Sequence, residues 1–107
     1  MKFQHQDLAN SEKWAKMAFG VQMANIGSEV SRALNWRKKQ KFDLSQKAIV
    51  RALELLWLTI EVAKGYPRLK ELCRVREILI DYFFYDNEYG SSEILWRKYF
   101  DYFIPIK

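Results

Sequence analysis

The sequence has little of what metal and nucleophile chemistry requires. It contains one cysteine, Cys73, and one histidine, His5, in 107 residues. One of each cannot supply a structural zinc site, and the Glu-x-x-His pairs of a di-iron helical bundle are missing. A single cysteine excludes an internal disulfide and gives no sign of an oxidising compartment. We expect Cys73 to be a buried, inert thiol, because no base is placed beside it in the sequence.

Other absences narrow the class of protein further. The sequence lacks a glycine-rich phosphate loop and the Gly-x-Ser-x-Gly motif of serine hydrolases, so we assign no catalytic residue. Its apolar runs are too short to cross a bilayer, and its N-terminus lacks the apolar segment of a secretory signal. We therefore expect a cytoplasmic protein with no membrane contact, no metal and no cofactor. The absences favour a non-enzymatic role without excluding an enzyme.

What the sequence does contain is helical periodicity. Half of its residues are hydrophobic, and they recur at spacings of three and four. The segment 43–64 is apolar over most of its circumference, so several other elements must cover it. The pattern predicts an all-α, up-down antiparallel four-helix bundle, because the connections between helices are short. We expect one domain, 1–107, with a loosely ordered N-terminus, 1–10, and with helices at about 11–36, 43–64, 67–85 and 92–103.

The first predicted helix carries a core seam and a row of small residues beside it. Met23, Ile26 and Val30 follow the spacing of a buried helix face. Gly20 and Gly27 lie inside this predicted helix, and a glycine in a helix interior costs about 1 kcal/mol relative to alanine. The cost predicts either close approach of another helix or a kink near Gly27.

One charged residue falls on an apolar helix face. Arg76 lies among the leucines of the third predicted helix, and an unpaired buried guanidinium is very costly. Glu29 is the partner we prefer for it. Two interpretations stay open: an interhelical ion pair that sets helix register, or an anion-binding or catalytic arginine that lines a groove.

The positive charge of the chain is concentrated in its first half. Residues 1–51 hold ten Lys/Arg against four Asp/Glu, whereas residues 81–107 hold three against five. The basic run 36–41, WRKKQK, lies between the first two predicted helices and is the best nucleic-acid signal. Basic side chains neutralise phosphates, and a tryptophan can stack on an unpaired base. A solvated surface turn is the alternative. The candidate nucleic-acid contacts are Arg32, Trp36, Arg37, Lys38, Lys39 and Lys41.

Aromatic residues gather at the other end of the sequence. Residues 82–103 hold ten of the seventeen aromatic residues. A four-helix core of this size cannot bury all ten, so the surplus predicts a surface for self-association into a homo-oligomer.

Four segments carry a resemblance to known proteins: NIGSEVSRALNW, RALELL, RLKELCRVRE and DYFFYDNEYGSS. Through them the region 25–103 resembles small uncharacterised prokaryotic all-α proteins. More remotely, the helix order is similar to the HEPN and ribosomal-intervening-sequence four-helix bundles. That resemblance implies RNA binding, RNA cleavage or an oligomeric accessory role. Its ribonuclease branch would show an arginine followed five to seven positions later by histidine, and no histidine follows Arg74 or Arg76 in that window.

The sequence therefore supports three hypotheses. The first is a small helical-bundle interaction module that self-associates and binds a protein or RNA partner. The second is a HEPN-like RNA-processing enzyme whose catalytic motif differs from that of the family. In this enzyme, Arg76 would act with Glu29 or Asp81 in a dimer cleft. The third is a bundle that binds a ligand in an apolar pocket.

Overall fold

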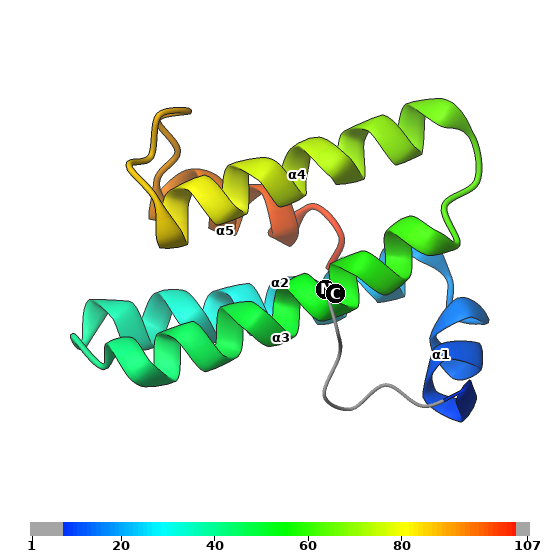
Figure 1. The fold of residues 1–107 in the computed structure, drawn as a ribbon, viewed down its shortest axis with the longest axis horizontal. Helices are drawn as coiled ribbons and strands as arrows, with labels where there is room; N and C mark the ends of the chain where they lie inside the picture. Colours follow the sequence, from blue (N-terminus) through cyan, green and yellow to red (C-terminus); the bar gives the residue numbers. More distant parts are fainter. Residues whose placement is uncertain (1–7, 105–107) are drawn as a thin grey trace.

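The fold consists of two helical layers. One layer is an antiparallel helical hairpin, and the other contains two further helices that pack on it (Figure 1). A computed structural model describes residues 8–104 of the chain. The hairpin consists of α2 (Phe19–Lys38) and α3 (Phe42–Glu61). Along the hairpin, α4 (Tyr66–Phe84) packs on α3 and α5 (Glu93–Asp101) packs on α2. The short α1 (Leu8–Ala15) also contacts α3. The predicted all-α bundle is confirmed.

The core lies between the two layers. Met23, Ile26 and Val30 are almost fully buried, as their spacing predicts. The central helix α3 contacts α1, α2 and α4, which accounts for its wide apolar arc. The remaining buried apolar residues are Trp14, Ala33, Leu34, Ala48, Ile49, Ala52, Leu53, Leu56, Leu72, Val75, Leu79, Trp96 and Phe100.

The prediction of one continuous helix over 11–36 was wrong, because the chain breaks between Ala15 and Phe19. Trp14 is buried, and its indole N–H donates to the Thr59 hydroxyl on α3 at 3.0 Å. The side-chain amide of Gln22 donates to the Trp14 carbonyl at 2.8 Å and so satisfies a group that a continued helix would have used. Docking of Trp14 on α3 thus turns α1 away from the axis of α2.

Close approach, rather than a kink, explains Gly27. A Cβ atom at this position would lie 2.8 Å from the Cβ of Phe100, which is too close for two carbons that are not bonded to each other. The helix α2 is continuous through this point. Gly27 therefore lets α5 lie against α2 and bury Phe100, and the helix propensity lost at glycine is exchanged for that contact.

Two further predictions concern Cys73 and the N-terminal segment. Cys73 is exposed on α4, so the prediction of a buried thiol was wrong. The predicted loose segment 1–10 lies outside the described residues up to residue 7, where His5 also falls, and α1 already begins at Leu8.

Candidate nucleic-acid interface

The turn between α2 and α3 presents the basic run at one end of the hairpin (Figure 1). Gln40 takes a left-handed conformation with φ of 61°. The Lys41 N–H donates to the Trp36 carbonyl at 2.9 Å, and the Gln40 N–H donates to the Arg37 carbonyl at 3.0 Å. These two bonds are the Schellman pattern that closes a helix C-terminus. The turn is therefore fixed by its own backbone, and the basic side chains are free to spread around it.

Four of the six predicted contact residues are exposed cations. Arg32, Lys38, Lys39 and Lys41 all lie at the surface. Lys38 is 3.8 Å from Glu93 on α5, whereas Lys39 and Lys41 make no ion pair with any described residue. The Nζ atom of Lys39 lies 5.5 Å from the centre of the half-buried Trp36 ring, a cation–π geometry. The structure therefore brings Trp36, Lys39 and Lys41 together at one surface.

Arg37 points inward instead. Its guanidinium donates to the Tyr82 carbonyl at 3.1 Å and lies 4.6 Å from the Tyr82 ring centre and 5.4 Å from that of Phe83. Arg37 thus ties the end of α2 to the end of α4. It still has unused N–H groups, because one bond to a carbonyl occupies only one of the five donors of a guanidinium.

The positive charge at this end exceeds the nearby negative charge. Residues 37–47 hold five Lys/Arg against one acidic residue, Asp43, a net charge of +4. Glu93 is the acidic group that reaches the turn from another helix, through Lys38. A hydrogen bond from Arg97, together with the charges of Lys38 and Arg97, lowers the pKa of Glu93 against a smaller opposing effect of burial. Glu93 is therefore ionised at neutral pH and neutralises part of the turn.

A small pocket opens beside the turn, between the start of α3 and the end of α4. Its volume is about 270 Å³. The α3 residues that line it occupy positions i, i+3, i+4 and i+7, which form one face of a helix. Phe42 is 62% exposed at its edge. The lining residues are Arg37, Phe42, Ser45, Gln46, Ile49, Phe83 and Phe84.

Glu29 and Arg76, the predicted interhelical pair, do not meet. Glu29 instead lies 3.6 Å from Arg32 on its own helix and 3.7 Å from Arg51 on α3. Arg76 forms no ion pair with a described carboxylate, and its Nε atom is buried without a hydrogen-bond partner. The interhelical partner of Glu29 is therefore Arg51.

Asp81, the other acid considered for catalysis, holds the loop after α4. Its two carboxylate oxygens accept hydrogen bonds from the backbone N–H groups of Glu88 at 2.9 Å and Tyr89 at 3.0 Å. Its side chain is buried. These bonds assign Asp81 a structural role.

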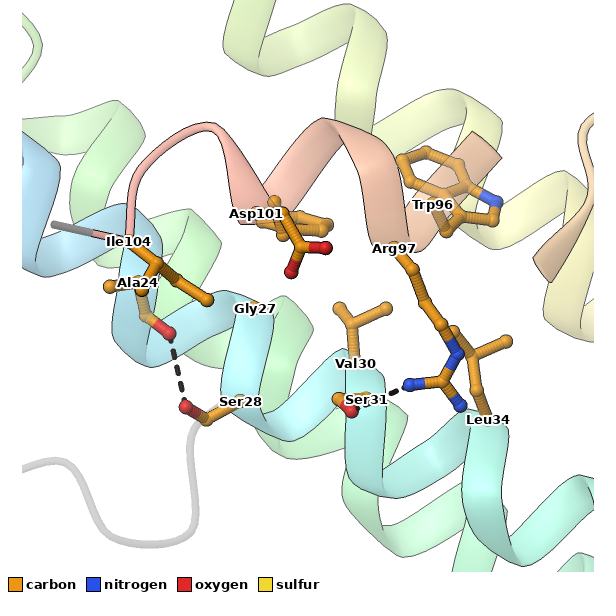
Figure 2. A pocket seen from close by; sticks show the side chains of 11 residues that line it. Ala24, Gly27, Ser28, Val30, Ser31, Leu34, Trp96, Arg97, Asp101 and Ile104 are labelled. Carbon is orange, nitrogen blue, oxygen red and sulfur yellow. Dashed lines mark hydrogen bonds between the residues drawn. The ribbon is translucent and has the colours of Figure 1, made fainter. Parts of the chain in front are cut away.

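A groove of about 580 Å³ lies between α2 and α5. Figure 2 shows Arg97 reaching from α5 toward Ser31, with Asp101 farther along the groove. The Arg97 guanidinium donates to the Glu93 carboxylate at 2.9 Å, to the Ser31 hydroxyl at 2.9 Å and to the side-chain amide oxygen of Asn35 at 2.8 Å. Arg97 is therefore a bridge that holds α5 on α2.

The C-terminal aromatic residues divide as expected between core and surface. Trp96 and Phe100 are buried, and four others are half-buried. Burial and a hydrogen bond of 2.6 Å to Glu71 raise the pKa of Tyr99. The exposed members are Phe84, Tyr85, Tyr89 and Tyr102.

Sequence reasoning missed Phe42 and Arg97. Phe42 was assigned to the connection between the first two predicted helices, because the second of them was predicted to begin one residue later. The feature that could have identified Phe42 is an aromatic residue that directly follows a lysine of the basic run. Arg97 had no signal of its own, because its partners on α2 are more than sixty residues away.

Comparison of the chain with protein-family models, with curated proteins and with solved structures gave no match. Across residues 8–104, no helix is both long and apolar enough to cross a bilayer. Within the same range, no three histidine, cysteine or acidic side chains gather as metal ligands would.

Proposed function

We propose that this chain is a non-catalytic, cytoplasmic binding module for single-stranded nucleic acid, with the α2–α3 turn as its contact surface. One observation carries the proposal. Lys39 and Lys41 are exposed and have no carboxylate partner among the described residues. Lys39 lies 5.5 Å from the centre of the Trp36 ring, and Lys41 directly precedes the exposed Phe42 in the chain. Lysines that contact phosphates release counterions, and aromatic rings stack on unpaired bases.

Removal of charge from the turn tests the proposal. In fluorescence anisotropy with a labelled single-stranded oligonucleotide, we expect the triple variant Lys38→Gln, Lys39→Gln and Lys41→Gln to bind weakly. Each phosphate contact to a single strand contributes about −0.7 to the slope of log K against log salt concentration. Loss of three contacts should therefore make this slope shallower by roughly 2.

A matched control separates the site from the overall charge. The triple variant Lys64→Gln, Lys70→Gln and Lys98→Gln removes the same charge from exposed positions away from the turn. It should bind as the unaltered protein does. If both triple variants weaken binding to the same extent, the turn is not the site.

Self-association is a second part of the proposal, carried by the outer surface of α4 and α5. A mostly apolar groove of about 370 Å³ lies there, and Tyr89, Ile94 and Leu95 beside it are more than half exposed. A second copy of the chain would cover this surface. Light scattering after size exclusion should show a dimer mass that falls to a monomer in Leu95→Glu and persists in Val21→Glu, an exposed position on α2. A monomer in the unaltered protein would contradict this part.

The enzyme hypothesis has less support from the geometry. It needs Arg76 to act with Glu29 or Asp81, and both acids are engaged with other groups of the protein. Cleavage of RNA by the purified protein that is lost in Arg76→Ala, without loss of stability, would restore it.

A further inference from the structure

The pocket beside the turn has walls suited to a flat aromatic group. Three phenylalanines, Phe42, Phe83 and Phe84, contribute to its lining. Phe42 is 62% exposed and Phe84 38%, so both rings offer apolar surface to solvent. Exposed rings at the entrance of a pocket cost free energy that a stacked ligand would recover.

Its polar groups converge on the same space. Arg37 is one of the lining residues, and its guanidinium retains N–H groups beyond the one that binds the Tyr82 carbonyl. Gln46 contributes an exposed amide that can both donate and accept. The Ser45 hydroxyl already donates to the Ala33 carbonyl at 2.8 Å, so it can only accept from a ligand. Such groups suit the edge of a nucleobase, which carries both donors and acceptors.

Size and charge narrow the occupant further. A pocket of about 270 Å³ is smaller than the roughly 300–1,000 Å³ typical of sites for drug-sized ligands. A second copy of the chain is disfavoured, because a two-fold contact at this end would oppose two surfaces of net charge +4. Lys41 directly precedes Phe42 in the chain, and Lys38 directly follows Arg37. Cations therefore flank the pocket where a phosphate backbone would pass.

We infer that this pocket receives one unpaired base of single-stranded nucleic acid, stacked against Phe42 and the phenylalanines at the end of α4, while the lysines of the turn hold the adjoining phosphates. The inference rests on the proposed function and adds to it a specific subsite. Stacking reads the face that all bases share, so the subsite accepts different bases.

The test compares two oligonucleotides of equal length and charge. One is an ordinary labelled single-stranded 10-mer, as RNA and as DNA in separate arms, and the other has an abasic backbone. The unaltered protein should bind the ordinary strand about 5- to 150-fold more tightly, the range that stacking of one base on an aromatic ring gives. Phe42→Ala should weaken binding of the ordinary strand towards the abasic level, so that only the part of the difference supplied by Trp36 remains, and should leave abasic binding unchanged. Phe42→Trp should retain the difference.

Tyr66→Ala is the matched control, because Tyr66 is a 71% exposed aromatic residue on α4 that does not line the pocket. It should keep the full difference between the two strands. Equal binding of ordinary and abasic strands by the unaltered protein would overturn the base subsite and leave the proposed function standing. Absence of binding to either strand would overturn both. Loss of the difference in Tyr66→Ala as well would also overturn the assignment to this pocket.

Discussion

Substitution of the two glycines of α2 tests how α5 is seated on the hairpin. A Cβ at position 27 would lie 2.8, 3.0 and 3.1 Å from the Cβ, Cγ and Cδ1 atoms of Phe100. The Phe100 ring cannot swing away, because it is buried and packs against Trp96 and Tyr99 at centroid distances of 6.1 and 5.0 Å. The helix α5 itself must then move.

Two opposing effects set the change in the free energy of unfolding that Gly27→Ala should cause. Overpacking costs about 1–3 kcal/mol, whereas alanine gains about 1 kcal/mol over glycine in a helix interior. Three contacts formed at once with an immobile ring place the overpacking in the upper part of its range. We expect Gly27→Ala to lower the free energy of unfolding by about 1–2 kcal/mol.

Gly20→Ala provides the control on the same helix. A Cβ at position 20 meets nothing within 4 Å, and position 20 is the second residue of α2. Alanine there should raise the free energy of unfolding by about 0.5–1 kcal/mol. Urea denaturation followed by circular dichroism measures both variants. If Gly27→Ala stabilises the protein as much as Gly20→Ala does, α5 does not lie against α2 at this point.

Three further predictions concern charged side chains. Arg97→Met keeps the apolar stem but removes three hydrogen bonds, and for a partly exposed group it should cost about 1–2 kcal/mol in the same denaturation assay; an unchanged midpoint would contradict the bridge. Arg76→Met should change stability by less than about 1 kcal/mol, because no described carboxylate pairs with the guanidinium; a loss of about 3–5 kcal/mol would reveal a buried partner. Glu93 has a lowered pKa in the folded state, so its contribution is present above its ordinary value of 4.5 and is lost as the pH falls through the folded value. Between pH 6 and pH 3 the urea midpoint of Glu93→Gln should therefore fall less than that of the unaltered protein, and equal falls would refute the ion pairs of Glu93.

The buried residues of the core could be predicted from the sequence, because the apolar residues on the buried face of a helix recur every three or four positions. Met23, Ile26 and Val30 recur at helical spacing, and the structure buries all three. Gly27 was recognisable as an exception to helix propensity, which predicted either a neighbour at close range or a kink. The fold class and the hairpin thus follow from local pattern.

The break before α2 could not be predicted in this way. Lys16, Met17 and Ala18 are all compatible with a helix, and the break depends on the contact of Trp14 with Thr59, a residue 45 positions away. The partner of Glu29 was missed for a related reason. Periodicity assigns a residue to a face of its own helix, but the choice between Arg51 and Arg76 depends on which helix lies against that face.

The candidate site was only partly visible in the sequence. The basic run was evident from composition, and four of its exposed cations lie where a partner can reach them. The inward turn of Arg37 was not predictable, since it depends on the rings of Tyr82 and Phe83 at the end of α4. The pocket exists only where α3 and α4 converge, so no local segment could reveal it.

Amide chemical-shift mapping tests the central claim most directly. A chain of 107 residues suits two-dimensional NMR of the isotope-labelled protein titrated with a single-stranded oligonucleotide. The account predicts that the largest shifts cluster at residues 36–46 and 82–85 and that they disappear at high salt. Shifts centred on the outer surface of α4 and α5, or no shifts at low salt, would contradict it.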